Sequence, residues 1–215
     1  EGNIANAENF MILPILITAY LILSADFVKK LLPSRIYFLA GIILSLAFLT
    51  KIVAVFDFLA FSSFLFIDQE KNFKKQLLEK VFPFTLGFLA PVALTFLYFF
   101  LTNNFKDFFN ALLFSNVGYV GYGNNFFIPQ GLLYLKAFVL AIFIGFLFLK
   151  RNSTNRAILF IVIWFAFSLF NTFFAGRPYT HYLLVLLPSF CLMIGVVLSA
   201  RKERFFIIVF LILNF

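Results

Sequence analysis

The chain has 215 residues, 63% of them hydrophobic and 12% charged, with a formal net charge of +8. Soluble domains carry about 25% charged and roughly 45–50% apolar residues. This composition, with its 37 phenylalanines, therefore excludes a soluble globular domain and requires a lipid environment. The basic residues stand in short clusters between apolar runs, which is typical of loops facing anionic lipid and disfavours nucleic acid as a partner. The single cysteine, Cys191, excludes a disulfide framework.

Apolar runs follow one another along the chain and predict membrane-spanning helices. A spanning helix needs about 20 apolar residues, and the runs lack the alternating polarity of barrel strands. We therefore predict an all-α fold, a polytopic transmembrane bundle with about eight membrane segments, as a single transmembrane domain over residues 1–215. The runs cover residues 10–23, 36–50, 52–67, 82–101, 131–149, 157–175, 179–200 and 205–215.

The connections between these runs alternate in charge, and the alternation predicts the orientation of the chain. Every second connection is strongly basic, and the others hold only Lys51, Lys106 and Arg177. Because cytoplasmic loops carry an excess of Lys and Arg, residue 1 and the weakly basic connections are predicted to be extracytoplasmic. The basic connections contain Lys29, Lys30, Arg35, Lys71, Lys74, Lys75, Lys80, Lys150, Arg151, Arg156, Arg201, Lys202 and Arg204.

Residues 36–67 would be about 48 Å long as one helix, which is too long for a bilayer. Both flanks are basic and hence predicted to be cytoplasmic, so we predict a hairpin of two short helices with Lys51 at its tip. Lys51 has two interpretations. In the first, Lys51 extends its ammonium group to water at the membrane surface. In the second, Lys51 binds a phosphate group, because a compact ammonium group in a partly dry site attracts an anion strongly. The shortness of the hairpin favours the second.

The longest extracytoplasmic connection covers residues 102–130. Its first half mixes phenylalanines with asparagines and Lys106, and it predicts a helix lying in the membrane interface. Its second half is glycine-rich and carries Tyr119 and Tyr122. These two tyrosines are candidates for sugar-stacking faces or for part of a lid.

Two acidic residues stand at the start of, or inside, apolar runs. Glu8 precedes the first run, and two interpretations are evenly balanced: an acid favoured at a helix start by the helix dipole, or an acid lining a cavity that opens outward. Asp57 lies within the third run and is predicted to turn into the bundle, paired or protonated, because a charge in the membrane is costly.

The densest group of polar residues on the predicted outer side is Gly176-Arg177-Pro178-Tyr179-Thr180-His181-Tyr182. Proline suits the first turn of a helix, which would place Arg177 at the helix mouth and His181 one turn further in, about 6 Å along the axis. An arginine and a histidine stacked at the outer end of a helix suit a phosphate or pyrophosphate. A structural histidine and interfacial tyrosines are the alternative.

Three segments together resemble the GT-C superfamily of polytopic glycosyltransferases. They are Asn6-Ala7-Glu8, Gly41-Ile-Ile-Leu-Ser-Leu-Ala-Phe-Leu-Thr-Lys51, and Gly176-Arg177-Pro178-Tyr179-Thr180-His181-Tyr182-Leu183-Leu184 continuing to Pro188. The similarity is to the group that includes dolichyl-phosphate-mannose–protein mannosyltransferases and bacterial lipid A aminoarabinose transferases. It covers most of the chain.

The resemblance implies a sugar transferred from a polyprenyl-phosphate donor to a lipid, glycan or protein acceptor, at the extracytoplasmic face of a bacterial inner membrane. It implies Glu8 as the second acid of the cavity, Lys51 as a contact to the donor phosphate, and Arg177 with His181 at the cavity mouth. Tyr119, Tyr122 and Tyr179 are then candidates for sugar or lid contacts. The catalytic aspartate of the family would precede residue 1, so we expect the chain to be a fragment.

Other classes of membrane protein remain as alternatives. A secondary transporter would place its polar residues near the bilayer midplane, in repeated halves, and no repeat is evident here. A polysaccharide ligase or polymerase would carry a large arginine- and histidine-rich outer loop. A scaffold would leave Lys51, Arg177 and His181 without a shared cavity. The sequence indicates no cofactor and leaves the involvement of a divalent metal open.

Overall fold

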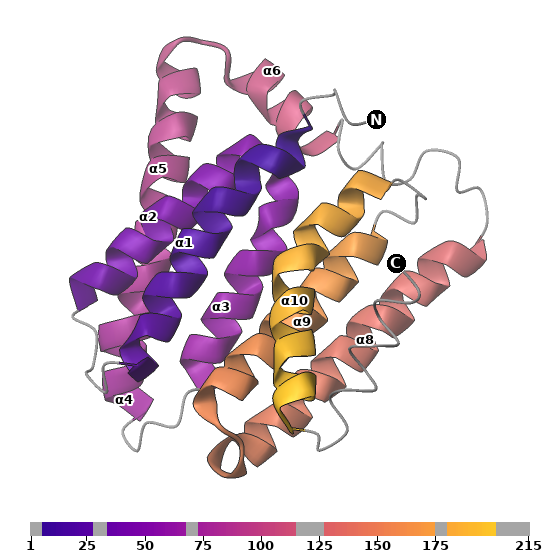
Figure 1. Cartoon of the computed structure of the whole chain (residues 1–215). Coiled ribbons are helices and arrows are strands. Elements are labelled where there is room, and N and C mark those ends of the chain that lie inside the picture. Colours follow the sequence, from indigo (N-terminus) through magenta and orange to yellow (C-terminus); the bar gives the residue numbers. More distant parts are fainter. Residues whose placement is uncertain (1–5, 28–33, 68–72, 115–126, 175–179, 201–215) are drawn as a thin grey trace.

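A computed structural model describes residues 6–27, 34–67, 73–114, 127–174 and 180–200 of the chain (Figure 1). Within these ranges the chain is helical and contains no strand, which confirms the predicted all-α fold. The elements are α1 (Ala7–Phe27), α2 (Ser34–Thr50), η1 (Ile52–Ala54), α3 (Val55–Ile67), α4 (Phe73–Gln76), η2 (Leu77–Val81), α5 (Phe82–Leu101), α6 (Phe105–Phe109), η3 (Asn110–Phe114), α8 (Phe127–Lys150), η4 (Arg151–Ser153), α9 (Arg156–Phe174), η5 (Thr180–Tyr182) and α10 (Leu183–Ala200).

Among the described residues, three helical stretches are long and apolar enough to cross a membrane, namely Ala7–Ser24, Phe73–Leu101 and Arg156–Phe174. Three shorter apolar helices accompany them, Ser34–Thr50, Ile52–Ile67 and Leu183–Ser199. These helices are compatible with the predicted integral membrane protein. The last predicted run, residues 205–215, lies outside the described residues.

Several helix boundaries differ from the predicted runs, and two of them change the predicted connections. The fourth run begins at Phe73 instead of residue 82, because α4, a π-helical turn (η2) and α5 form one continuous helix. Lysine and glutamate are good helix formers, so Lys74 to Lys80 extend the helix and do not interrupt it. The fifth run begins at Phe127 instead of residue 131, which shortens the predicted loop of residues 102–130. The first half of that loop is helical, as predicted, in α6 and η3.

Figure 1 shows the long helices running alternately up and down, with α1, α2 and α5 on one side of α3 and with α8, α9 and α10 on the other. Helices α2 and α5 are in backbone contact. A Cβ atom built on Gly41 would lie 2.1 Å from the carbonyl oxygen of Phe84, and one on Gly87 would lie 1.9 Å from that of Phe38. Small residues let membrane helices approach this closely.

The interface between α3 and α9 is aromatic and holds one buried acid. Phe61 stacks on Phe160 with ring centroids 5.3 Å apart, and both contact Trp164. The indole Nε1 of Trp164 donates a 2.8 Å hydrogen bond to Oδ1 of Asp57, whose side chain is 2% exposed. Asp57 therefore turns into the bundle and is paired, as the sequence predicted.

The two ends of the bundle differ in charge. At one end, called the basic end below, lie the start of α2, the end of α3, α4 and the connection from α8 to α9 (Figure 1). The opposite end, called the site end, holds the start of α1, the α2–α3 turn, α6 and η5. The described basic residues of the basic end are Arg35, Lys74, Lys75, Lys80, Lys150, Arg151 and Arg156.

Candidate functional site

Glu8 lies in the first turn of α1 at the site end. This position fits the first interpretation, an acid at a helix start, and the lining of an outward cavity by Glu8 stays a prediction. A carboxylate is favoured at a helix start, where backbone N–H groups lack partners inside the helix. Yet its side chain is only 2% exposed, so it points into the bundle and not into solvent. A buried carboxylate requires a charged or hydrogen-bonding partner.

Lys51 supplies that partner from the turn of the predicted hairpin. The backbone of Lys51 is extended, with φ −154° and ψ 126°, and so interrupts the helix between α2 and η1. Its N–H donates to the carbonyl of Ala47 at 3.0 Å, and its carbonyl accepts from the N–H of Ala54 at 3.1 Å. The break therefore leaves both backbone groups satisfied and holds Lys51 at the end of α2.

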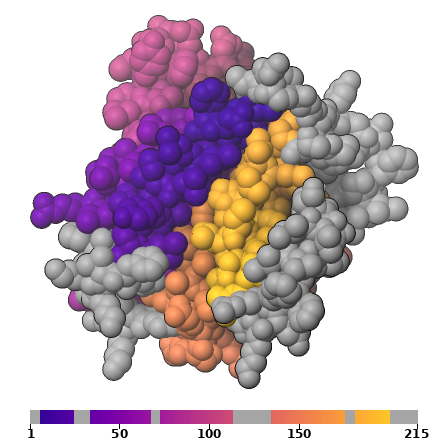
Figure 2. All heavy atoms as spheres, viewed as in Figure 1, coloured from indigo at the N-terminus to yellow at the C-terminus, as the bar shows by residue number. Residues whose placement is uncertain are grey.

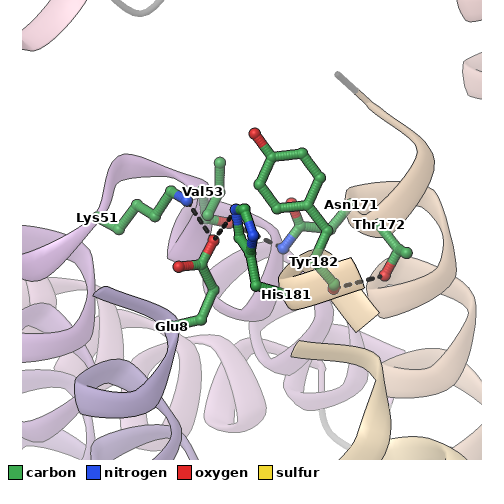
Figure 3. A network of polar contacts seen from close by, with 7 residues as sticks. All are labelled: Glu8, Lys51, Val53, Asn171, Thr172, His181 and Tyr182. Carbon is green, nitrogen blue, oxygen red and sulfur yellow. Dashed lines mark hydrogen bonds and ion pairs between the residues drawn. The ribbon is translucent and has the colours of Figure 1, made fainter. Parts of the chain in front are cut away.

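The ammonium group of Lys51 forms an ion pair with Oε1 of Glu8 (Figure 3). The lysine side chain is 27% exposed, so one face of the pair is buried and the other is open. Lys51 Nζ also lies 5.0 Å from the centre of the Tyr182 ring, a distance at which a cation is attracted to an aromatic face.

His181 completes the cluster from η5, which immediately precedes α10. Its Nε2 lies 3.9 Å from the same Oε1 atom of Glu8, and its side chain is 25% exposed. Its ring is 4.7 Å from that of Tyr182, in an edge-on arrangement. We predicted His181 inside a helix, but it lies in a 3-10 turn, and α10 begins at Leu183.

Helix α9 holds the two turns that carry these residues. The Asn171 side-chain amide donates to the carbonyl of Val53 in η1 at 3.3 Å, and the Thr172 hydroxyl donates to the carbonyl of Tyr182 at 3.4 Å (Figure 3). Figure 2 shows α1 and α10 side by side on one face of the molecule, and the start of α1 and η5 meet at its upper end. The cluster therefore depends on α1, α2, α9 and α10 at once.

The structure thus brings together Glu8, Lys51 and His181, which the resemblance assigned to one cavity. Their roles in that cavity stay predictions. Arg177, Tyr179, Tyr119 and Tyr122 lie outside the described residues. Sequence reasoning did not select Asn171, Thr172 or Tyr182 for the site. Asn171 and Thr172 are polar residues inside an apolar run, and this signal could have identified them.

Chemically, the cluster is a buried carboxylate that holds one ammonium group and faces one imidazole. A lysine has three N–H donors, so after pairing with Glu8 it can still donate to an anion or to a sugar hydroxyl. Within the described part of the chain, no group of three or more His, Cys, Asp and Glu residues could hold a metal ion.

Fold and site together define an all-helical protein, among the described residues, with helices apolar enough to cross a membrane and a charged cluster at one end of the bundle. Comparison with known proteins gives no match to any family model, curated protein or solved structure. The similarity to GT-C glycosyltransferases therefore remains a prediction based on the sequence motifs.

Proposed function

We propose that this chain is part of a GT-C-type membrane glycosyltransferase. It would move a sugar from a polyprenyl-phosphate donor to a lipid, glycan or protein acceptor at the extracytoplasmic face of a bacterial inner membrane. The observation that carries the proposal is the meeting of Glu8, Lys51 and His181 from three distant segments. Their cluster lies at the site end of the bundle. The positive-inside rule assigns the opposite end, the basic end, to the cytoplasm.

Lys51 is proposed to bind the donor phosphate. When the sugar leaves the donor, negative charge develops on the polyprenyl phosphate, and a fixed cation beside it stabilises the transition state. The cation is held on its buried side by Glu8 and is open on the other, with 27% of the side chain exposed. A partly dry site strengthens its attraction to an anion.

Glu8 is proposed to orient Lys51 and His181. Its buried Oε1 pairs with Lys51 Nζ and lies 3.9 Å from His181 Nε2, so one carboxylate oxygen is next to both side chains. Such an arrangement limits the rotamers of the lysine before the donor arrives, which lowers the entropy lost on binding. The base for the acceptor hydroxyl is proposed to be an aspartate upstream of residue 1.

The first experiment uses undecaprenyl phosphate as a probe, because its binding does not depend on the identity of the sugar. The Lys51→Gln variant of the purified protein should bind it at least about tenfold more weakly than the wild type, since one direct ion pair with phosphate is lost. Lys106→Gln is the matched control, because Lys106 lies at the same end, in α6, and is exposed. Equal affinity of the wild type and Lys51→Gln would remove the basis of the site assignment.

The second experiment measures sugar transfer by the full-length protein, which includes the proposed upstream aspartate, from undecaprenyl-phosphate donors carrying hexoses, N-acetylhexosamines or an aminopentose. Loss of a preorganised electrostatic contact lowers turnover by roughly 100-fold to 1,000-fold, and this loss is expected for Lys51→Gln, with Lys106→Gln unchanged. Monodisperse elution of each variant in detergent controls for folding. Normal turnover in Lys51→Gln would contradict the proposed role.

Asp57 favours a second candidate, a secondary transporter, because an acid inside a membrane helix is a default candidate for ion or proton coupling. Its Oδ2 is buried and has no hydrogen-bond partner in the part of the chain that the structure describes. The Asp57→Asn variant separates the two functions. A transferase with its site at Lys51 keeps its turnover in this variant, whereas a transporter coupled through Asp57 loses accumulation of its substrate in vesicles.

A further inference from the structure

A second feature of the molecule lies near the basic end, away from the Glu8–Lys51–His181 cluster. A hollow of about 420 Å³ separates the lower half of α3 from η2 and α8. Pockets for small ligands have volumes of roughly 300–1,000 Å³. Phe66 of α3, Val81 of η2, and Gly145 and Phe148 of α8 line it, and Ser62 and Ser63 add two hydroxyl groups to an otherwise mainly apolar wall.

The hollow is open towards the surroundings of the bundle. A Cβ atom built on Gly145 would meet no other atom within 4 Å, so the backbone of α8 borders empty space there. Neighbouring α8 side chains are exposed, with Ile142 at 56% and Phe146 at 52%. In a membrane, these surfaces contact lipid chains, and a lipid chain can enter the hollow from the side.

The rim of the hollow at the basic end carries cations. The guanidinium group of Arg151 lies 4.2 Å from the centre of the Phe148 ring, which itself lines the hollow. Lys150, which is exposed, is the last residue of α8. Basic pockets between membrane helices at the cytoplasmic side bind anionic lipid headgroups.

We propose that this hollow binds an anionic glycerophospholipid of the leaflet at the basic end. One acyl chain lies against Phe66, Gly145 and Phe148, and the phosphate contacts Arg151 and Lys150. The order of the groups along the hollow matches the lipid, because Arg151 follows α8 at the basic end, and Gly145 and Phe148 precede it along the helix, further from that end.

The experiment measures lipids retained by the purified protein after exchange into detergent containing phosphatidylglycerol or phosphatidylcholine with the same acyl chains. Native mass spectrometry counts the bound lipids. A basic residue near an anionic headgroup changes binding about fivefold, so the wild type should retain phosphatidylglycerol at least about fivefold better than phosphatidylcholine. Equal retention of the two lipids overturns the proposal.

Two pairs of variants test the parts of the site. Gly145→Leu fills the hollow and should remove the retained phosphatidylglycerol, whereas Gly195→Leu, at an equally open glycine on α10, should keep it. Arg151→Gln should lower the preference for phosphatidylglycerol about fivefold, whereas Arg35→Gln, exposed at the same end in α2, should not.

Each other outcome counts against the proposal. Retention in Gly145→Leu equal to that of the wild type means that the lipid binds elsewhere. A change in oligomeric mass without a change in lipid count means that the α3–α8 face contacts a second copy of the chain. If Gly145→Leu does not fold, Arg151→Gln alone tests the site, and an unchanged preference for phosphatidylglycerol in that variant overturns the proposal.

Discussion

The close packing of α2 against α5 gives a prediction of destabilisation for Gly87→Ala. The new Cβ atom would lie 1.9 Å from the carbonyl oxygen of Phe38 and 2.8 Å from its carbonyl carbon. Both atoms belong to the backbone, so no side chain can move aside. The two helices would have to separate by roughly 1 Å to relieve the contact, and a gap of this size forfeits a quarter to a half of the van der Waals attraction of each atom pair that it opens.

The expected cost lies at the upper end of the range for overpacked cores, about 2–3 kcal/mol. For a chain of about 200 residues this corresponds to a fall in the melting temperature of roughly 4–12 °C. Thermal unfolding in detergent, followed by the loss of the monodisperse peak, measures the shift. Because α2 ends next to Lys51, the same variant should also weaken the binding of undecaprenyl phosphate.

Gly195→Ala is the matched control. A Cβ atom at Gly195 would meet nothing within 4 Å, so the substitution adds no clash and removes a residue with poor helix propensity. Its melting temperature should equal or slightly exceed that of the wild type. If Gly87→Ala and Gly195→Ala were equally stable, α2 and α5 would not be in backbone contact, and the packing described above would be wrong.

Two further predictions concern local structure. Trp164→Phe should lower the stability by about 1–3 kcal/mol, because it leaves the buried Oδ1 of Asp57 without its donor. Asp57→Asn should lower the stability less, because the amide oxygen of the asparagine still accepts the bond. A lower melting temperature for Asp57→Asn than for Trp164→Phe would contradict the pairing of Asp57 with Trp164. Asn103 has a φ of 58°, in the turn between α5 and α6, so Asn103→Val should cost roughly 1–2 kcal/mol and Asn103→Gly should not. Equal thermal stability of the two Asn103 variants would show that this turn relaxes without strain.

The presence of the helices could be predicted from the sequence, but not all of their limits. Apolar runs mark only the parts of the helices that meet lipid. The helix from Phe73 to Leu101 continues through lysines and a glutamate. Lys75 and Glu79 lie one turn apart on this helix, with Lys75 Nζ 3.9 Å from Glu79 Oε2. The break at Lys51 was predictable, because the length limit of the bilayer and the basic flanks together require a turn there.

The members of the site could be predicted one by one, but their contacts could not. Glu8, Lys51 and His181 each stand out as a polar residue beside an apolar run. Nothing local to residues 8 and 181 indicates that one carboxylate oxygen faces both Lys51 and His181. That contact depends on how α1 packs against α10. The supporting bonds from Asn171 and Thr172 depend likewise on the placement of α9.

The wide spacing of the charged cluster along the chain has a consequence for biosynthesis. Glu8 and Lys51 are 43 positions apart, so their ion pair can form as soon as α1, α2 and Lys51 have left the ribosome. His181 is made much later, after α9. During synthesis, an early intermediate therefore holds the carboxylate and the ammonium group alone, and the complete cluster appears only when α10 docks against α1.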